Sequence, residues 1–244
     1  GGAGALIRSR VPSRHGRWVR RDWEEYLENR DLRYIEQEIS DVEYVVPLVY
    51  ASTIAQYRNV SSSANIQAST EHYLEIQNWR IDKGRFINQQ DVTSAAKVVV
   101  LGSLLAKDLF GDEEPVGKEI KLDGIRLVVI GVLAPFNLFG DTNSRILAGP
   151  YTTAQMRFIG NERLNSIVVR ATSPDKAENV AQEIRLVLRR THEHGADFRV
   201  ETGQDSIEQF NRVVFILKAI AGGIAGISLL VGGIGIMNIM LVSV

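Results

Sequence analysis

The distribution of apolar and charged positions changes abruptly near the carboxyl end of the chain. Residues 219–244 carry no charged side chain, whereas the 218 residues before them mix charged and apolar positions as water-soluble proteins do. A helix of these 26 residues is roughly 39 Å long, and the hydrocarbon core of a bilayer is about 30 Å thick. The pattern therefore predicts a transmembrane helix over residues 219–244.

The residues just before this tail have the periodicity of a helix. Apolar side chains recur close to helical spacing at Ile207, Phe210, Val214 and Leu217. Since no proline separates them from the tail, we predict a stalk helix over residues 205–218 that enters the bilayer unbroken. The sequence ends at Val244 without the charged residues that usually follow a transmembrane helix. We therefore expect the chain to be a fragment of a longer protein that ends inside or just after this helix.

The amino-terminal part has the order strand, helix, strand. Residues 5–9 and 42–50 have strand composition, and Pro47 places the second of these strands at an edge or a bend. Between them, Asp22 is positioned to cap a helix that runs to about Ile39. The predicted apolar side of that helix consists of Trp23, Tyr26, Leu27, Tyr34 and Ile35.

The same order returns much later in the chain. Residues 166–171 are a β-branched run, Ser173 and Pro174 start a helix that Gly195 closes, and residues 198–201 begin another strand. The apolar face of this helix is predicted to be Ala177, Val180, Ala181, Ile184, Val187 and Leu188. Two distant βαβ-like halves predict one α/β subdomain with a second one inserted into it.

The inserted part is predicted to be rich in strands. Within residues 118–132, Asp123-Gly124 stands between two apolar runs, a pattern typical of a two-residue hairpin turn. The return strand is apolar on both faces, which places it inside a sheet, and residues 98–101 are a second buried strand followed by a short helix. The whole pattern indicates an α+β fold.

Composition and motifs exclude several classes of function. The net charge of −1 argues against a nucleic-acid partner, because phosphate neutralisation needs a basic excess. The chain has no cysteine and no G-x-x-x-x-G-K-[ST] phosphate loop. His192 and His194 could bind a metal, but a third ligand is not evident, so a solvated helix end is favoured. We expect no catalytic residue, no metal site and no cofactor in this chain.

Glycine is frequent in the predicted membrane helix. Residues 219–244 contain six glycines, and the spacing small-x-x-x-small occurs at Gly222 and Gly226 and again at Ser228 and Gly232. Small residues let helix backbones approach closely in lipid, so these four residues are predicted to pack against a partner helix. The alternative is that glycine is simply common in spanning helices.

Charge is uneven at the amino terminus. Residues 1–21 contain six arginines and no acid, whereas residues 22–50 contain nine acids and two arginines. The basic arm either contacts anionic lipid headgroups or the acidic segment behind it, or it is a solvated arm without a partner.

Several short motifs are shared with a known family of membrane proteins. They are Val98-Val99-Val100-Leu101-Gly102, Leu109-Phe110-Gly111, Pro115-Val116-Gly117 and Val129-Ile130-Gly131-Val132. These motifs resemble the outer core domain of MacB/FtsX-like ABC transporter permeases. The tail over residues 226–244 resembles the second membrane helix of the MacB branch. Weaker likeness at residues 39–47 and 164–171 extends the resemblance over nearly the whole chain.

The resemblance implies an organisation into five parts. In that family the two βαβ halves form a porter-like subdomain and the insert forms a smaller β-rich one. The first and second halves of the porter-like subdomain are then residues 1–51 and 159–204, and the β-rich insert is residues 52–158. The stalk helix over residues 205–218 and the transmembrane helix over residues 219–244 follow.

The resemblance also implies partners and a function. It implies a homodimer or paired permease in the cytoplasmic (inner) membrane, with the main domain on the periplasmic side. The other implied partners are membrane lipid and a membrane-fusion adaptor protein. ATP and Mg²⁺ are expected to be held by a partner, a cytoplasmic ABC ATPase. Export of drugs, peptides or lipoproteins by mechanotransmission is expected, because in that family ATP-driven dimerisation moves the stalk helices and the outer domains close on cargo. The alternatives are an FtsX-like signalling permease that regulates a cell-wall hydrolase, and an anchored enzyme, for which no site is evident.

Overall fold

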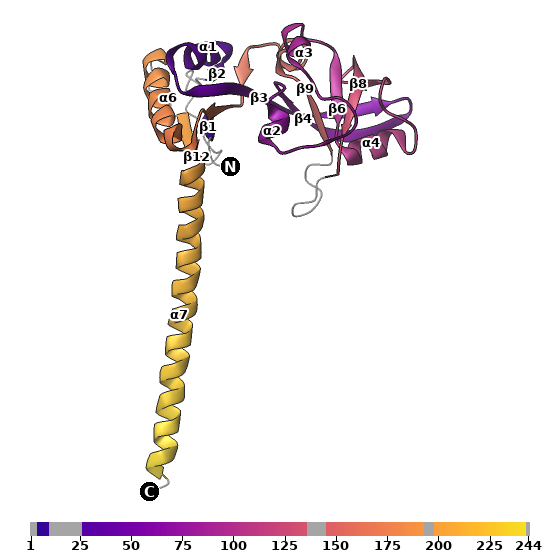
Figure 1. The fold of residues 1–244 in the computed structure, drawn as a ribbon. Helices are drawn as coiled ribbons and strands as arrows, with labels where there is room; N and C mark the ends of the chain where they lie inside the picture. The colour runs from indigo at the N-terminus through magenta and orange to yellow at the C-terminus, as the bar shows by residue number, and fades with distance from the viewer. Residues whose placement is uncertain (1–3, 10–25, 136–144, 193–197, 243–244) are drawn as a thin grey trace, which may run out of the picture.

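The computed structural model describes residues 4–9, 26–135, 145–192 and 198–242, which form two lobes and a long helix (Figure 1). The strands are β1 (Gly4–Ser9), β2 (Leu27–Glu28), β3 (Val42–Tyr57), β4 (Val60–Ser69), β5 (Ile81–Gly84), β6 (Val98–Leu101), β7 (Glu119–Leu122), β8 (Ile125–Leu133), β9 (Ile146–Pro150), β10 (Arg163–Leu164), β11 (Ser166–Ala171) and β12 (Phe198–Thr202). The helices are α1 (Asn29–Glu38), α2 (Tyr73–Ile76), α3 (Gln89–Thr93), α4 (Ser103–Phe110), α5 (Tyr151–Ala154), α6 (Ala177–Thr191) and α7 (Gly203–Val242), with a π-helical turn η1 (Gln155–Ile159) and a 3₁₀ turn η2 (Pro174–Lys176). The predicted α+β fold is confirmed.

The first lobe is an antiparallel sheet with two helices on one face. Its strand order is β12-β1-β11-β3, and every neighbouring pair is antiparallel. Each βαβ half therefore places one of its strands between the two strands of the other half, as in a split βαβ arrangement. The two halves cannot separate without breaking the sheet. The residues that α6 buries are those predicted from its periodicity: Ala177, Val180, Ala181, Ile184, Val187 and Leu188.

The second lobe is built on the strand order β4-β9-β6-β8-β5, with β7 joining β3 and β8. Successive residues of β6 point to opposite faces of this sheet, so Val99 and Val100 belong to different apolar clusters. On one face α4 packs through residues such as Leu105. On the other face an irregular segment packs, in which the Tyr73 and Trp79 rings meet edge to face with centroids 5.3 Å apart.

The β7–β8 hairpin has the predicted turn. Asp123 and Gly124 have φ of 47° and 84°, as a type I′ turn requires at both central residues. β8 pairs with β6 and β5 as well as with β7, which confirms its predicted position inside the sheet.

Strand β3 belongs to both lobes (Figure 1). It pairs with β11 as far as Leu48 and with β4 from Val49 onward. Pro47 lies just before this change of partner, on a stretch that is a local edge of the described sheet, where a residue without an N–H group is tolerated. The strand as a whole is nevertheless central. The predicted domain limit after residue 51 falls inside β3, which continues to Tyr57. The domain limits at residues 51, 158 and 204 stay predictions.

The predicted start of the first helix is wrong. α1 begins at Asn29, and Leu27 lies in β2, opposite Leu164 of β10. The cause is a capping box in which the Glu28 and Asp31 side chains each accept a hydrogen bond from the other residue's backbone N–H. The predicted cap at Asp22 and the apolar residue Trp23 lie outside the described residues, as do Gly195 and most of the basic arm.

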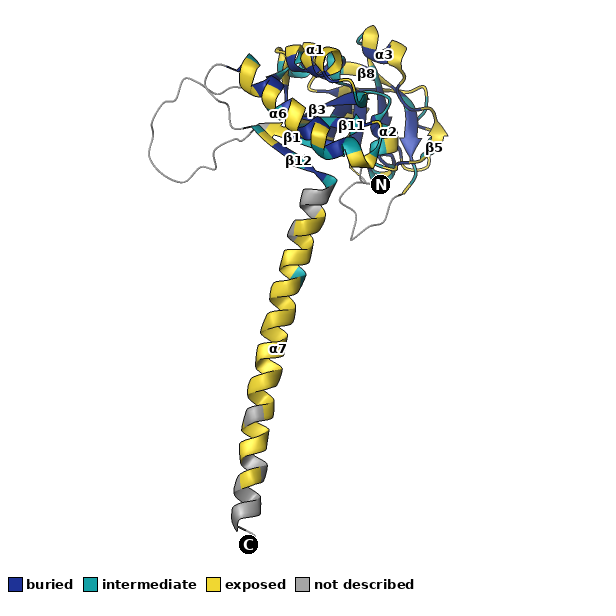
Figure 2. Cartoon of the chain, turned by 60° about the vertical axis from the view of Figure 1, so that its left-hand side comes forward, coloured by how far each residue is buried: buried dark blue, intermediate teal, exposed yellow. Residues whose placement is uncertain are grey.

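Helix α7 is continuous from Gly203 to Val242 and leaves the first lobe directly after β12. Figure 2 shows that its described side chains are exposed along nearly the whole length. Among the described residues it is the helix with the length and composition to cross a membrane, with a candidate span Phe210–Ile234 of mean hydropathy 2.2. The predicted continuity of stalk and membrane helix is confirmed. The candidate span begins before residue 219 because the stalk is itself apolar, and Arg212 and Lys218 are long enough to reach headgroups.

Gly131 of β8 lies against the backbone at Arg85, because a Cβ added there would stand 2.3 Å from the Arg85 carbonyl oxygen. We predict that Gly131→Ala lowers the free energy of unfolding by about 1–3 kcal/mol, because the two segments must move apart. The measurement is chemical denaturation of the chain in detergent. Gly4→Ala is the matched control, since its added Cβ would make an ordinary 3.7 Å contact. Equal losses in both variants would contradict the close approach.

Candidate functional site at the junction of the lobes

A cleft of about 490 Å³ lies where the two lobes meet. Its lining comes from α1, the first residues of β3, the connection from β4 to α2, α3 and α5. The ring of Tyr44 on β3 stacks on that of His72, with centroids 4.5 Å apart and an interplanar angle of 4°. The cleft is thus bounded by segments that are far apart in the sequence.

The cleft is acidic. Glu36, Glu43 and Glu71 contribute to its lining, and no lysine or arginine of the described residues does. Burial raises the pKa of Glu36 above its usual value, because a partly desolvated carboxylate loses hydration. The pKa of the Tyr151 hydroxyl is also raised, first by burial and then by the negative charges of Glu36 and Glu162. The site therefore disfavours further negative charge.

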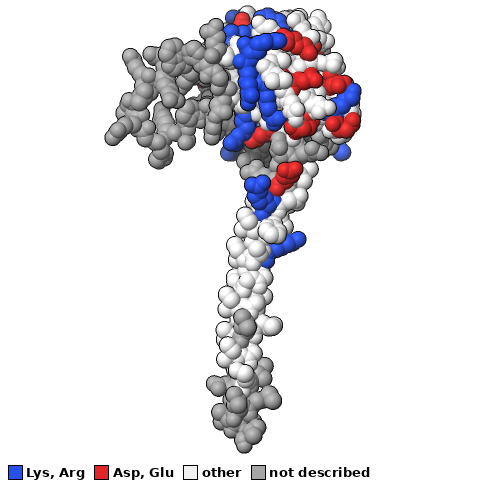
Figure 3. Space-filling view, turned by 90° about the vertical axis from the view of Figure 1, so that its left-hand side faces the viewer, with Lys and Arg blue, Asp and Glu red and all other residues white. Residues whose placement is uncertain are grey.

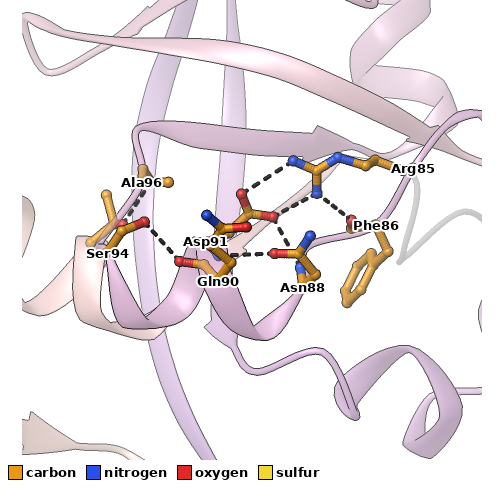
Figure 4. Close-up of polar contacts among 8 residues, drawn as sticks. Arg85, Phe86, Asn88, Gln90, Asp91, Ser94 and Ala96 are labelled. Carbon is orange, nitrogen blue, oxygen red and sulfur yellow. Dashed lines mark hydrogen bonds and ion pairs between the residues drawn. The ribbon is translucent and has the colours of Figure 1, made fainter.

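Helix α3 is held in place on one side of the cleft by an ion pair (Figure 4). The Arg85 guanidinium donates to both carboxylate oxygens of Asp91, at 2.6 and 3.1 Å. Asn88 and Asp91 form a capping box at the start of α3. Arg85 therefore holds the pKa of Asp91 below its usual range. From α5, the Thr152 hydroxyl donates to the Val92 carbonyl oxygen at 2.6 Å.

A pair of hydrogen bonds joins α1 to the turn η1 at the end of the inserted part. The side-chain amides of Asn29 on α1 and Gln155 on η1 donate to each other's oxygen, at 3.1 and 3.0 Å. Gln155 is buried, and η1 has the rare π-helical form. The Arg163 guanidinium lies 3.7 Å from the centroid of the Tyr26 ring. The end of the inserted part is thereby fixed to the start of α1.

The favoured interpretation of His192 as a solvated helix end is wrong. His192 is 2% exposed, and its Nε2 lies 3.0 Å from Oδ1 of Asp31, which is fully buried. The pair joins the amino end of α1 to the carboxyl end of α6, where a carboxylate and an imidazole suit the helix dipoles. Sequence reasoning missed it because the partners are 161 residues apart. His194 lies outside the described residues, in which no group of three His, Cys, Asp or Glu could hold a metal ion.

The four predicted helix-packing residues lie on α7, with open space around the glycines. A Cβ added at Gly222, Gly226 or Gly232 would meet nothing within 4 Å, and the Ser228 hydroxyl donates to the Ile224 carbonyl oxygen at 2.9 Å. At about 100° per residue, Gly222 and Gly226 share one side of the helix, whereas Ser228 and Gly232 share another roughly 120° away. They form two patches, and their packing against a partner stays a prediction. Figure 3 shows that charge occurs on the globular part and the upper end of α7.

The comparisons with known proteins fit this architecture. The family model described as the MacB-like periplasmic core domain matches residues 2–187 of the chain. The chain belongs to this family. It is therefore the MacB-like periplasmic domain of an ABC permease, and with its apolar helix it is part of a membrane protein with an extracytoplasmic domain. The resemblance seen in the sequence is confirmed.

Two curated relatives illustrate the similarity. The Macrolide export ATP-binding/permease protein MacB of Wolinella succinogenes is 35% identical over 209 residues, which are 85% of this chain and 32% of the relative. The Pyoverdine export ATP-binding/permease protein PvdT of Pseudomonas savastanoi pv. phaseolicola is 31% identical over 211 residues, with the same two shares of 85% and 32%. The chain spans about a third of the length of these relatives.

Solved structures support the fold. The periplasmic region of MacB from Actinobacillus actinomycetemcomitans superposes with a TM-score of 0.73 at 24% identity, covering 86% of this chain and 92% of that one. The extracellular domain of the noncanonic ABC-type transporter YknZ from Gram-positive bacteria gives 0.68 at 19% identity, covering 81% of this chain and 99% of that one. At these identities the match concerns the fold alone.

The Arg85–Asp91 pair generates a pH-dependent prediction. Because the folded pKa of Asp91 is depressed, its stabilising effect is present above the ordinary carboxyl pKa of about 3.9 and is lost as pH falls through the folded value. We predict that Asp91→Asn lowers the free energy of unfolding by about 1–3 kcal/mol at pH 7. The difference from the unsubstituted chain should shrink at pH 3.

Chemical denaturation at the two pH values measures this effect. The control is Glu119→Gln, since Glu119 and Arg126 are exposed and 3.9 Å apart, and little change is expected there. An Asp91→Asn effect of the same size at pH 3 as at pH 7 would show that the ion pair is not its source.

Proposed function

We propose that this chain is the outer domain and second membrane helix of an ABC exporter permease subunit, which couples cytoplasmic ATP hydrolysis to export of drugs, peptides or lipoproteins by mechanotransmission. The observation that carries the proposal is α7, a single helix that leaves the first lobe and has the length to cross a bilayer. A displacement at the membrane end of α7 reaches the first lobe because no loop interrupts the helix.

The attachment of α7 to the sheet supports this coupling. β12 ends at Thr202, which is buried opposite Ala5 of β1, and α7 begins at the next residue. Through the ladders β12-β1-β11-β3, a tilt of α7 acts on every strand of the first lobe, and β3 carries it into the second lobe. The two hydrogen bonds between Asn29 and Gln155 oppose rotation of one lobe relative to the other.

The partners belong to the same proposal. The names of the relatives combine an ATP-binding part with a permease and refer to export, which supports an exporter over a signalling permease. We propose that a cytoplasmic ABC ATPase, fused or separate, holds ATP and Mg²⁺, and that this chain has no catalytic or cofactor-binding role. The proposed setting is the cytoplasmic (inner) membrane, with a paired permease copy and a membrane-fusion adaptor.

Breaking the stalk tests mechanotransmission. In the parent permease with its ATPase, Glu208→Pro removes a helical N–H group and kinks α7 above the bilayer. We predict that export falls at least ten-fold while ATP hydrolysis continues. Both rates are measured in membrane vesicles with a transported cargo. Glu208→Ala is the control and should export normally, because it removes the same exposed side chain and keeps the helix. Normal export by Glu208→Pro would refute a rigid stalk.

The glycine patch is tested in lipid. Replacing Gly222 and Gly226 by Leu fills the space that a partner backbone would occupy, so we predict at least a five-fold loss of crosslinking between paired membrane helices. Gly223→Leu is the matched control, because residue 223 lies about 100° away on the helix and also has open space around it. Equal crosslinking in the two variants would favour the alternative that these glycines have no packing role.

A further inference from the structure

Strand β3 has a neighbouring strand on one edge only where it passes between the lobes. Its ladder to β11 ends at Leu48, and its ladder to β4 begins at Val49. Backbone groups of β3 that face the other edge at this crossing have left the sheet and need another hydrogen-bond partner. Two side chains, one on each edge of β3, supply such partners.

These two side chains continue the ladders beyond the strands that carry them. Asn165, which directly precedes β11, accepts at its Oδ1 a hydrogen bond from the Tyr50 N–H at 2.7 Å. Ser69, the last residue of β4, donates from its hydroxyl to the Pro47 carbonyl oxygen at 2.8 Å. The first lobe therefore reaches forward to residue 50 and the second lobe reaches back to residue 47. The two lobes overlap on β3 through these two hydrogen bonds.

The two hydrogen bonds differ in their access to water. Ser69 is 1% exposed and Pro47 is buried, whereas Tyr50 is 43% exposed and Asn165 is exposed. An exposed hydrogen bond between neutral groups exchanges with water at little net cost, but breaking a buried one leaves its carbonyl oxygen unsatisfied. The bond between Asn165 and Tyr50 is therefore the one that opens first when the angle between the lobes changes.

We propose that the crossing is a latched pivot between the lobes, in which the Ser69–Pro47 bond is the pivot and the Asn165–Tyr50 bond is the latch. Opening the latch lets the angle between the lobes change about β3, and the hydrogen bonds between Asn29 and Gln155 limit that change. The cleft widens or narrows with this angle, because its lining comes from both lobes. The inference goes beyond the proposed function, since the latch needs neither the ATPase nor export.

Spin labels on the two lobes test the latch in the chain in lipid nanodiscs. They are placed at Leu186→Cys on α6 and Ile54→Cys on β3, which are both exposed, and labelled chain is diluted with unlabelled chain. We expect Asn165→Ala to make the distance distribution roughly two-fold wider, because the lobes then occupy more than one angle. Asn165→Asp should keep the narrow distribution, since a carboxylate oxygen accepts the same hydrogen bond.

Asn161→Ala is the matched control. Its Oδ1 also accepts an exposed backbone hydrogen bond, from the Arg163 N–H at 3.0 Å, but that bond lies two residues away along the chain. The substitution should leave the distance distribution unchanged. Hydrogen exchange at the Tyr50 amide reports on the latch itself and should become faster in Asn165→Ala. Faster exchange with an unchanged distance distribution would show that the bond is only local and would overturn the latch.

Thermal unfolding tests the pivot. Ser69→Ala leaves the buried Pro47 carbonyl oxygen without the hydroxyl that donates to it, so we expect a clear fall in the midpoint of unfolding. Ser52→Ala is the control and should leave the midpoint unchanged, because the Ser52 hydroxyl donates to Asn65 in an exposed contact within the second lobe. An unchanged midpoint in Ser69→Ala, or an equal fall in Asn165→Ala, would contradict the assignment of pivot and latch.

Discussion

The apolar side chains of α7 have no protein surface of the described chain to pack against, and the remaining architecture is arranged around this constraint. Side chains such as Phe215 and Leu229 are 71% and 80% exposed, which water does not tolerate over a continuous helix. Lipid or partner helices must cover them. Phe210, where the candidate span begins, lies eight residues beyond the end of β12, which is roughly 12 Å of helix.

The strand order of the first lobe connects α7 to the whole sheet. β12 is an edge strand, yet β1 and β11 interleave the two halves of the lobe, so a force on β12 is shared by the whole sheet. β3 then continues into the second lobe without a loop, and the buried Asp31–His192 pair fixes α1 to α6. The result is an outer body of interleaved strands joined directly to one continuous helix, with a cleft between its lobes.

The sequence predicted the elements whose signal is local. The burial of α6 follows from its helical spacing, and the Asp123-Gly124 turn follows from the need for positive φ. The continuity of α7 follows from the absence of proline after residue 205, and its apolar end follows from the absence of charge over residues 219–244. The contacts that join distant segments left no such signal. Asp31 and His192, Asn29 and Gln155, and the carboxylates of the cleft each become neighbours through the sheet order, which periodicity does not encode. The predicted start of α1 was wrong because residues 27–28 form strand β2 with the distant β10, and the capping box of Glu28 and Asp31 then begins the helix at Asn29.

The central claim is that α7 and the first lobe move as one body. Labels are placed at Leu186→Cys on α6 and Ile220→Cys on α7, both of which are exposed, and this chain adds no cysteine of its own. Electron paramagnetic resonance then gives the distance between them in the parent permease in nanodiscs, without nucleotide and with ATP bound. We expect one narrow distribution that is unchanged by ATP, while the separation of the Ile220→Cys positions in paired copies changes. A distance from α6 to α7 that shifts or broadens with ATP would place a hinge between β12 and α7 and contradict the account.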